Sequence, residues 1–578
     1  MPNNATFVSR LLQGILYAVL FAITGLASCG GSVSSSDDPS DPNTPPPVPT
    51  PAAIADVAAE WAATAYRSGT ITHYCDCGTG AEIDCQPGAD GNSGTAASPK
   101  QTIASAIATL NAAASGETVA LCQGGAFDAL SGFNITRSGC AVGTTCVDLR
   151  EYAPTTFPGT AKPIINHPTS GTSLFTVNGN LGGVRFLNLT LNGNNGVRGN
   201  DNAGFFFYDG AHDVIMGNLD MNNFDTAVYN AGGNPGVVRT SNIKLTGSRI
   251  TNSRTMGFLG AGINADISYN YWDGNGSSDS REHTIYLSAA QHVTNMQLVG
   301  NYVRGQYGPT CLGAPIVAHV AVDGLLVAYN TVEIDAAETT SGCWGIEFDN
   351  VTGDPDAVYH RRATFSGNTV INGGNRGLTI TTCPDCIIEN NIIVQDWPYS
   401  FELMGINVPS QAAKIAQGDD VNTRNIIRNN TVWFGPNTLN GGIGIRVGLE
   451  GIGHIVANNT VYFGATSGGS QGIDCYDYGL ALTDYAFINN NHCYSAAASY
   501  EWVNGRGSLA SWQTYATARG FDSASIEGDA PMFTAVGTDF TPGAGSPLIG
   551  AGSNANKSTL DITGATRPSP PAIGAFEP

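Results

Sequence analysis

The sequence predicts an all-β fold, a right-handed parallel β-helix with a helical N-terminal cap and a C-terminal cap. The first observation is a phrase of apolar residues around a central Asn or Ser, repeated from residue 188 to residue 491. The second is the spacing of these phrases, which is typical of stacked supersecondary units: the shortest step runs from position 248 to position 270 and the longest from position 391 to position 430. The third is the alternation of apolar and polar residues, rich in Val, Ile, Tyr and Phe, which indicates strands.

The central residues of the phrases have a structural explanation. Asn adopts the left-handed backbone region more readily than most residues, which suits a tight turn in a closely coiled chain. Asn amides stacked at one strand spacing, about 4.8 Å, can also hydrogen-bond into a ladder. We therefore interpret these residues as scaffold and not as ligands. They are Asn188, Asn218, Ser248, Asn270, Asn301, Asn330, Asn368, Asn391, Asn430, Asn459 and Asn491.

Each repeat also contains a second strand, which begins near His283, Trp344, Arg376 or Gly442 in four of the units. Strands stacked on their copies in the next turn make a parallel β-helix, and the usual crossover preference makes it right-handed. The shortest step, from position 248 to position 270, shows how little chain one turn needs. The steps from 330 to 368 and from 391 to 430 are much longer and therefore carry loops, where we expect a functional site.

The composition fits one elongated domain and narrows the set of partners. The chain has 578 residues, of which 42% are hydrophobic, only 12% are charged and 73 are glycine. Its net charge is 25 − 47 = −22, whereas nucleic-acid binders present a basic face, so we expect no nucleic-acid partner. We also expect the chain to be a monomer. An acidic substrate is compatible with this charge, because a local basic patch or a bound cation reverses the field locally.

The N-terminus predicts export. Arg10 precedes an apolar run that ends in Leu26-Ala27-Ser28-Cys29, which resembles a bacterial lipoprotein signal with Cys29 as the lipidated residue. A membrane-spanning helix is the alternative, because the run approaches spanning length. A polar and then Pro-rich linker follows, which would hold the folded part away from the membrane. The resemblance implies a lipid anchor in the outer membrane or at the cell surface.

Two helix-forming stretches outside the repeats predict the caps. They cover residues 98–110 and 508–519, and each places apolar residues on one helical face. A β-helix needs caps because its first and last turns expose an open edge and an end of the core. The resulting segments are a signal peptide (1–28), a linker (29–53), the N-terminal cap and first turns (54–170), the repeats (171–496) and the C-terminal cap (497–578).

Both ends of the folded part resemble a known superfamily. At the N-terminal end an Asp/Asn/Gly-rich loop (88–95), the helix and the strand Gly116-Glu-Thr-Val follow one another. The tail contains Asp529-Ala-Pro-Met-Phe and Arg567-Pro-Ser-Pro-Pro. This order is similar to that of bacterial right-handed parallel β-helix repeat proteins of the pectate-lyase-like superfamily. The resemblance implies the fold, but it says little about activity, because this fold hosts lyases, hydrolases, epimerases and adhesins.

The sequence motifs known from enzymes of that superfamily are mostly missing. The NTD, GHG and RIK phrases of polygalacturonase-like hydrolases do not occur, nor does the RxPxxR phrase of pectate lyases. The DPHD phrase of mannuronan epimerases is absent as well. No catalytic template can therefore be transferred, and the candidate site depends on geometry.

The cysteines agree with export. Thirteen cysteines minus Cys29 leave twelve, an even number that favours disulfides in an exported chain. Sequence proximity favours the local pairs Cys140–Cys146, Cys311–Cys343 and Cys475–Cys493. Zinc is the alternative for Cys383-Pro-Asp-Cys386, but no second CxxC or nearby His pair completes such a site.

Alternation along the second strands predicts a polar cluster on their outer face. We align Ile346 and Phe348 as inward residues with Leu378 and Ile380, with Phe401 and Leu403, and with Ile443 and Ile445. One outward column then contains Tyr286, Glu347 and Glu402, and the next contains Ser288, His319, Asp349 and Arg446. Arg281 and His283 immediately precede the first of these strands.

This cluster predicts a polysaccharide lyase that acts on an acidic glycan by β-elimination. The candidate catalytic residues are His319, Asp349, Glu347, Tyr286 and His283, because His and Tyr can supply the base and the acid. Arg281, Arg446 and Glu402 are candidates for substrate binding. One alternative is a glycoside hydrolase with paired carboxylates, and another is a surface protein that only binds glycan or another surface.

Two further features are candidates for ligand binding. Asp273, Asn275 and Asp279 have oxygen ligands at alternate positions, as in a calcium loop, although the closing Glu is missing. Calcium is therefore the candidate cofactor. The aromatic residues Trp272, Trp397, Tyr399 and Trp433 could stack on sugar rings, with turn packing as the alternative.

Overall fold

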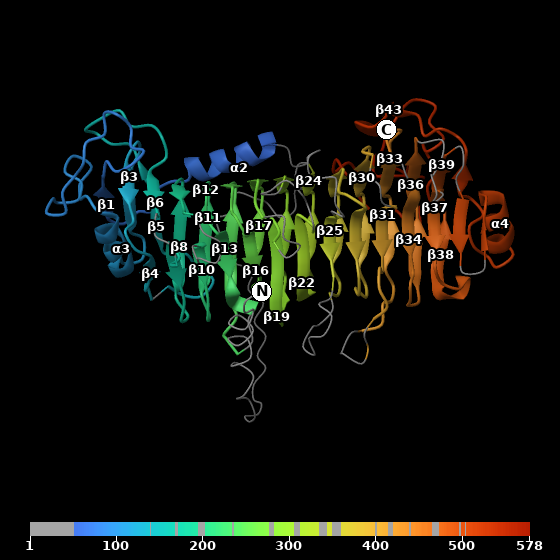
Figure 1. Cartoon of the computed structure of the whole chain (residues 1–578), viewed down its shortest axis with the longest axis horizontal. Helices are drawn as coiled ribbons and strands as arrows, with labels where there is room; N and C mark the ends of the chain where they lie inside the picture. The colour runs from blue at the N-terminus through green and yellow to red at the C-terminus, as the bar shows by residue number, and fades with distance from the viewer. Residues whose placement is uncertain are drawn as a thin grey trace, which may run out of the picture.

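The chain forms an elongated solenoid of stacked turns (Figure 1). The computed structural model describes residues 51–138, 140–167, 171–194, 203–233, 236–276, 282–305, 313–334, 344–349, 360–398, 402–413, 415, 420–438, 441–464, 473–495, 499–502 and 505–578, without the side chains of 51, 52, 289–292 and 321. No helix within these ranges is long and apolar enough to cross a membrane.

Three sheets, each of 14 strands in the described ranges, run the length of the solenoid. We number them in the order in which one turn of the chain enters them. Sheet 1 consists of β1 (Ile71–Tyr74), β2 (Thr118–Cys122), β5 (Val147–Tyr152), β8 (Gly182–Leu187), β11 (His212–Gly217), β14 (Ser241–Thr246), β17 (Asp266–Ser268), β20 (Gln297–Val299), β23 (Leu326–Ala328), β26 (Thr364–Ser366), β29 (Ile387–Glu389), β32 (Ile426–Arg428), β35 (His454–Ala457) and β38 (Tyr485–Asn489).

Sheet 2 and sheet 3 complete each turn. Sheet 2 consists of β3 (Ala126–Asp128), β6 (Ile164–Asn166), β9 (Thr190–Asn192), β12 (Asp220–Asn222), β15 (Arg249–Thr251), β18 (Tyr271–Asp273), β21 (Tyr302–Arg304), β24 (Thr331–Glu333), β27 (Thr369–Ile371), β30 (Ile392–Gln395), β33 (Thr431–Phe434), β36 (Thr460–Phe463), β39 (His492–Tyr494) and β42 (Ile526–Glu527). Sheet 3 consists of β4 (Phe133–Ile135), β7 (Phe175–Val177), β10 (Ala203–Phe207), β13 (Thr226–Asn230), β16 (Met256–Gly260), β19 (Ile285–Thr294), β22 (Ile316–Asp323), β25 (Trp344–Phe348), β28 (Arg376–Ile380), β31 (Leu403–Val408), β34 (Gly442–Val447), β37 (Ile473–Tyr478), β40 (Ser499–Trp502) and β41 (Gly505–Gly507).

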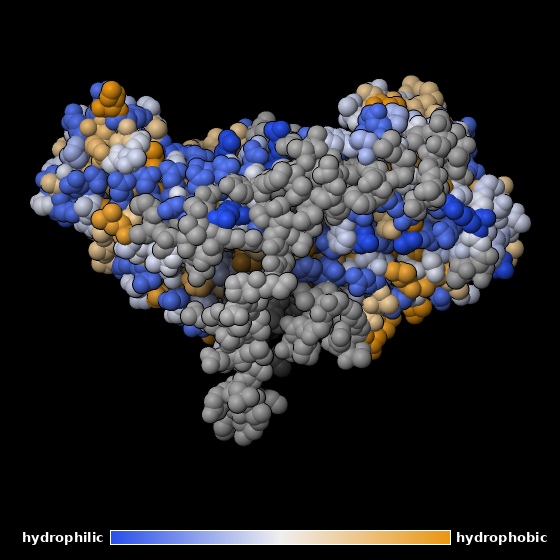
Figure 2. Space-filling model, viewed as in Figure 1, coloured by the Kyte–Doolittle hydropathy of each residue, from blue (hydrophilic) through white to orange (hydrophobic). Residues whose placement is uncertain are grey.

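The predicted parallel β-helix is confirmed, and its core is a continuous apolar column between the three sheets. Apart from the antiparallel pair β40–β41, the paired strands of these sheets are parallel. One inward column of sheet 3 is buried along its whole length, and each such side chain stabilises the fold by about 1.5–3 kcal/mol. It contains Phe175, Phe205, Val228, Phe258, Ile285, Ile316, Ile346, Leu378, Ile406, Ile445 and Tyr476. The coloured residues on the face that Figure 2 shows are mostly hydrophilic, as the alternation requires.

The corner between sheets 1 and 2 carries the predicted Asn ladder. The Oδ1 atom of each ladder residue accepts hydrogen bonds from the backbone N–H and, where present, the Nδ2 of the ladder residue one turn earlier, at 2.9–3.2 Å. The other amide hydrogen is donated to a carbonyl of sheet 1, as from Asn391 to Phe365 at 2.9 Å. Ser248 and Ser525 end the ladder. Its members are Asn270, Asn301, Asn330, Asn368, Asn391, Asn430, Asn459 and Asn491, and all are buried.

The left-handed turn and the ladder are made by different residues, which corrects the prediction that one Asn does both. The left-handed residue precedes the ladder residue, as in Asn390 (φ 56°) before Asn391 and Tyr269 (φ 53°) before Asn270. Asn188 (φ 57°) and Asn218 (φ 50°) occupy the left-handed position, and each is followed by a buried Leu. These two Asn residues are therefore one position out of register with the ladder.

Helix α2 (Pro51–Ala63), which we did not predict, lies along this corner. Ile54 packs against Tyr269, Val299 and Ala328. Trp61 is 1% exposed and lies so close to Gly217 that a Cβ there would clash with its ring. Figure 1 shows α2 in blue along the upper edge of the solenoid. Helix α2 covers the last three residues of the predicted linker (29–53), and the stacked strands begin at β1, within the segment predicted to hold the N-terminal cap and first turns (54–170).

Helices form at both stretches where the sequence predicted them. Helix α3 (Ile103–Ala112) has a buried face that includes Ile107 and Leu110, and Thr102 caps its N-terminus through Ser105 N–H at 3.2 Å. Helix α4 (Leu509–Thr517) buries Trp512. The tail beyond α4 includes β43 (Phe533–Ala535) and β44 (Asp539–Pro542), and it packs on apolar side chains of sheet 2 such as Trp433. The 3-10 turns η2 (Ala231–Gly233) and η5 (Leu482–Asp484) complete the elements.

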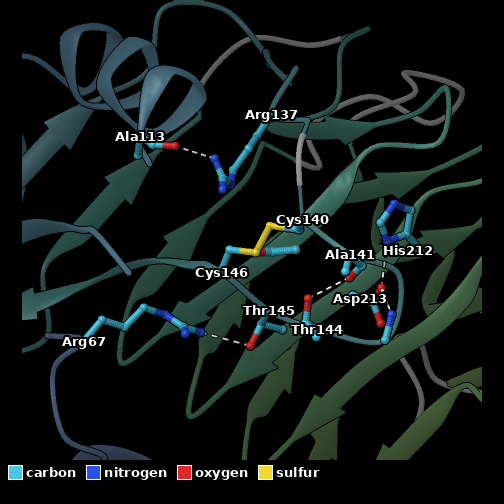
Figure 3. The surroundings of a disulfide bond; sticks show 12 residues. Arg67, Ala113, Arg137, Cys140, Ala141, Thr144, Thr145, Cys146, His212 and Asp213 are labelled. Carbon is cyan, nitrogen blue, oxygen red and sulfur yellow. Dashed lines mark hydrogen bonds and ion pairs between the residues drawn. A yellow bond between two sulfur atoms is a disulfide. The ribbon is translucent and has the colours of Figure 1, made fainter. Parts of the chain in front are cut away.

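Five disulfides are formed among the described cysteines. Cys140–Cys146 and Cys475–Cys493 confirm two predicted pairs, whereas Cys311 and Cys343 lie outside the described residues. Figure 3 shows the Cys140–Cys146 loop, where Thr144 Oγ1 donates to Ala141 O at 2.7 Å. The zinc alternative is wrong, because Cys383 and Cys386 pair with each other. The remaining pairs are Cys75–Cys122 and Cys77–Cys85.

Candidate functional site on the outer face of sheet 3

The outer face of sheet 3 carries one column of varied side chains. Strand β25 is central to it and belongs to the step from 330 to 368, the first of the two steps predicted to carry loops. The flanking residues 335–343 and 350–359 lie outside the described ranges. In pairing order the column contains Phe206, Tyr229, Leu259, Tyr286, Val317, Glu347, Thr379, Asn407, Arg446, Asp477 and Glu501.

The pairing of β31 differs from the predicted alignment by five residues against β28 and by three residues against β34. Leu403 pairs with Gly442, and Ile406 takes the place beside Leu378 and Ile445. Consequently Asn407, and not Glu402, follows Thr379 in the Glu347 column. Arg446 lies in this column too, and not in that of Asp349. Glu402 is exposed and lies outside the strand.

Tyr286 and two histidines form an edge-to-face cluster. The rings of His283 and Tyr286 are 5.1 Å apart at 68°, and those of Tyr286 and His319 are 5.5 Å apart at 90°. His283 is buried, and its Nδ1 lies 2.9 Å from Ala314 O. This contact fixes the imidazole that packs against the Tyr286 ring. Burial raises the pKa of Tyr286, partly opposed by its hydrogen bond with Ser288, so the phenol stays protonated at neutral pH.

His319 is oriented by the main chain. Its Nδ1 lies 3.1 Å from the carbonyl oxygen of Asp349, and Ser288 pairs with it on the preceding strand. A histidine that donates Nδ1–H to a carbonyl keeps its lone pair on Nε2. No described residue forms a hydrogen bond with this Nε2 atom. The structure therefore brings Tyr286, His319 and Asp349 together as predicted, with the imidazole arranged to accept a proton.

Glu347 is a buried carboxyl at the centre of the cluster. It is 7% exposed. Burial, the largest cause, and the nearby Asp349 together raise the pKa of Glu347 to about 8, and Arg376 opposes the rise. Asp349 Oδ1 accepts a hydrogen bond from Gln411 Nε2 at 3.3 Å. Below the cluster, burial and the nearby His319 lower the pKa of His360 to about 3. Glu347 is therefore mainly protonated at neutral pH, and His360 is neutral.

Arg376 and Trp344 complete the cluster, although sequence analysis did not single them out as functional. The guanidinium lies 4.3 Å from the centre of the Trp344 ring, and both side chains are partly exposed. Within the described part of the chain, no hydrogen bond or ion pair engages this guanidinium. Burial lowers the pKa of Arg376, with Glu347 as the largest opposing influence, but an arginine remains charged at neutral pH. The cluster thus presents a cation with open hydrogen-bonding positions.

The far end of the column is charged but internally paired. Arg446 Nε lies 2.6 Å from Asp477 Oδ2, and Arg506 Nη2 lies 2.8 Å from Asp474 Oδ2. Burial raises the pKa of Glu501, and Asp477 raises it further. Arg446 therefore has less capacity for a substrate carboxylate than Arg376. The other predicted arginine, Arg281, lies outside the described residues.

The predicted calcium ligands do not form a site in the described structure. Asn275 is fully buried, its Oδ1 accepts from Ser253 N–H at 3.0 Å and its Nδ2 donates to Ile250 O at 2.9 Å. Asp273 accepts from Tyr271 at 3.2 Å, and Asp279 lies outside the described residues. Among the residues described, no three His, Cys, Asp or Glu side chains are grouped to hold a metal. The amide of Asn275 serves the fold, so this loop does not fit a calcium site.

Two of the tryptophans proposed to stack on sugars are core residues. Trp272 is fully buried, and Trp433 is 5% exposed beneath the C-terminal tail. Trp397 is partly buried against the core, and Tyr399 lies outside the described residues. Turn packing, the alternative in the sequence analysis, thus explains Trp272 and Trp433.

Comparison with known proteins adds similarity of fold. No family model and no curated protein matches the chain. The surface adhesin PfbA of Streptococcus pneumoniae is 10% identical over 70% of this chain and 90% of its own, with a TM-score of 0.39. A lacto-N-biosidase from Eubacterium ramulus is 12% identical over 80% and 68%, with a TM-score of 0.39. A rhamnogalacturonan lyase is 13% identical over 73% and 87%, with a TM-score of 0.33. Similarities at this level carry no argument about activity.

Proposed function

We propose that the protein is a polysaccharide lyase that cleaves a uronate-containing glycan by β-elimination on the outer face of sheet 3. The observation that carries the proposal is the guanidinium of Arg376, held against Trp344 with open hydrogen-bonding positions on the outer face of sheet 3, two strands along from His319 and three from Tyr286. A guanidinium binds a carboxylate through two parallel hydrogen bonds. A cation, a base and an acid on one face are the three groups that this reaction needs.

Each group has one role in the reaction. Arg376 binds the uronate carboxylate and stabilises the charge that develops on it. Nε2 of His319 removes the proton from C5, the C4–O bond breaks and a C4–C5 double bond forms. The hydroxyl of Tyr286 gives its proton to the leaving oxygen, so one proton is taken up and one is released. The raised pKa of Tyr286 favours this role, since a phenol that stays protonated is available as an acid.

The test is direct. The purified protein is incubated with polygalacturonate, with alginate and with other uronate polymers, with and without calcium and a chelator. We expect the ultraviolet absorbance of an unsaturated uronate to rise. His319→Gln should abolish the rise, because an amide nitrogen has no lone pair available to take the C5 proton. An absent rise on every uronate polymer, or an unchanged rise in this variant, would overturn the proposal.

A glycoside hydrolase is the second candidate, and the pKa of Glu347 favours it. A carboxyl with a pKa of about 8 next to a second carboxylate, Asp349, is the acid–base pairing that hydrolases use. New reducing ends without ultraviolet absorbance would identify this reaction. Glu347→Gln should then abolish cleavage, whereas the lyase proposal expects the variant to remain active.

We also propose that the chain is exported and anchored at a cell surface through a lipid on Cys29. The five disulfides support export, because such bonds persist in oxidising compartments. Labelling of cells with a fatty-acid analogue should mark the wild-type chain. Cys29→Ser should lose the label and no longer be anchored, while Cys85→Ser should keep both properties. A labelled Cys29→Ser chain would contradict the anchor.

A further inference from the structure

Three aromatic side chains form a platform on the outer face of sheet 3. Phe206 and Tyr208 stack with ring centres 5.9 Å apart at 16°, and Phe206 and Tyr229 are 5.2 Å apart at 41°. All three are partly exposed. Their strand neighbours Phe205, Phe207 and Val228 are buried in the core, so alternation directs the platform rings outward.

The platform continues into the candidate site. Phe206 and Tyr229 lie in the same outward column as Tyr286, with Leu259 as the only position between Tyr229 and Tyr286. Two strand spacings, about 10 Å, therefore separate Tyr229 from Tyr286 along the solenoid axis. An extended glycan gains about one strand spacing per sugar, so a chain held at Tyr286 reaches the platform within a few sugars.

We infer that Phe206, Tyr208 and Tyr229 form a glycan subsite that stacks on a sugar ring of the substrate and aligns the chain along the solenoid axis. This inference rests on the proposed function for the identity of its ligand, a uronate polymer. A sugar presents an apolar face of C–H groups, which packs on an aromatic ring as another apolar surface does. The platform recognises the ring and not the carboxylate.

The contrast between platform and cluster gives the subsite its role. No charged side chain stands in the column from Phe206 to Tyr286, whereas Glu347, Arg376 and His319 follow on the next strands. The platform therefore holds the substrate without acting on it. Its loss should raise KM for long chains, leave kcat unchanged and leave short oligosaccharides unaffected.

The experiment separates binding from cleavage. Retention of the protein by polygalacturonate and by alginate is measured by affinity electrophoresis in the His319→Gln background. Phe206→Ala and Tyr229→Ala should each weaken retention about two- to tenfold. Phe206→Tyr and Tyr229→Phe keep a ring and should retain binding. Tyr271→Ala is the matched control, because it removes a ring from a similar stack on sheet 2, 5.7 Å from Tyr302.

Kinetics on uronate oligosaccharides of increasing length provide the second measurement. In the wild type, KM should fall with length and then level off, and the Phe206→Ala/Tyr229→Ala variant should lose this gain. Thermal unfolding checks that each variant folds. If the double variant does not fold, Tyr208→Ala replaces it, since this change leaves the Phe206–Tyr229 contact in place.

The possible outcomes distinguish a failure of the subsite from a failure of the proposed lyase activity. Unchanged retention and unchanged length dependence in a folded platform variant would overturn the subsite, whatever the activity. Retention that depends on the platform, without any unsaturated product from the wild type, would support the subsite and reject the lyase. A wild type that neither polymer retains would overturn the subsite.

Discussion

The Asn corner and the outer face of sheet 3 both stack polar side chains at one strand spacing, but their hydrogen bonding differs. In the corner, each amide is used fully. Asn391 accepts two hydrogen bonds from Asn368 and donates to Phe365 O and to Asn430. On the outer face, His319 has an open Nε2, and Arg376 has a ring contact but no hydrogen bond among the described residues.

This difference separates scaffold from site. A row of identical groups satisfies itself, because each copy supplies the partner of the next copy. A row of unlike groups leaves donors and acceptors open, and burial then shifts pKa values, as it does for Glu347. Changes in the corner should therefore alter stability, and changes on the outer face should alter activity.

The largest effect is expected in the ladder. Asn391→Ala removes the acceptor of the buried Asn368 N–H groups and the side-chain donor to Phe365 O and Asn430 Oδ1, which should lower the free energy of unfolding by about 4 kcal/mol. Urea denaturation followed by tryptophan fluorescence measures this loss. Asn192→Ala is the control, because that partly exposed residue donates a single amide bond, to Asn166. Equal losses in the two variants would show that the ladder has no special stability.

The next effect is expected at Arg376. Arg376→Ala should lower kcat/KM on a uronate polymer about 100-fold, because the substrate carboxylate loses its charged partner, and it should leave stability nearly unchanged. Arg249→Ala is matched to it, since Arg249 lies 5.2 Å from the ring centre of Tyr271 on sheet 2. If the two variants are equally active, Arg376 does not bind the carboxylate.

The pH dependence should report Glu347. The pKa of Glu347 is raised from 4.5 to about 8. Above pH 8 the ionised Glu347 places a carboxylate next to Arg376, which then pairs with that carboxylate and is no longer available to the substrate. Activity should then fall about tenfold per pH unit. Stability should fall as pH rises from about 4.5 to about 8, because in that window the unfolded chain has released a proton that the folded chain keeps. Glu347→Gln should flatten both profiles, and profiles that match the wild type would assign the titration to another group.

The smallest effect is expected at Trp344. Trp344→Leu removes the ring that fixes the Arg376 guanidinium, and a contact of this kind contributes about 1 kcal/mol. We expect kcat/KM to fall about fivefold and Trp344→Phe to recover most of the loss. Steady-state kinetics with the Arg376→Ala double variant provide the check. If the tryptophan acts through Arg376, the second change adds nothing, whereas additive losses would contradict that coupling.

Much of the fold and part of the site could be predicted from the sequence. The repeat predicts the stacked strands, and alternation places Tyr286, His319, Glu347 and Asp349 on one face. Trp344 and Arg376 were missed as functional residues because alternation breaks at Gly345 and Gly377. A Cβ at either glycine would lie 2.4 Å from the core side chain of Val370 or Ile393, so the glycine and the following residue both face inward.

The register of β31 and the position of α2 depend on contacts between residues that are far apart in the sequence, and the local pattern of apolar and polar residues does not predict such contacts. Phe401 and Leu403 fit the alternation as well as Ile406 and Val408 do, so the sequence allows two alignments. Only the pairing of Met404 with Arg376 selects between them. Helix α2 has short apolar side chains and follows a Pro-rich linker, and it is stabilised by Tyr269 and Val299, which lie far along the chain.

The sequence by itself determined the architecture, because a repeated alternation has one way to bury its apolar residues and close its amide ladder in each turn. The tertiary structure alone decided which outward side chains meet. Neighbours in a column, such as Glu347 and Thr379, are separated by a whole turn of chain. A change in the pairing register of one strand therefore changes every contact that this strand makes on that face. The open guanidinium of Arg376 and the aromatic platform are products of that pairing.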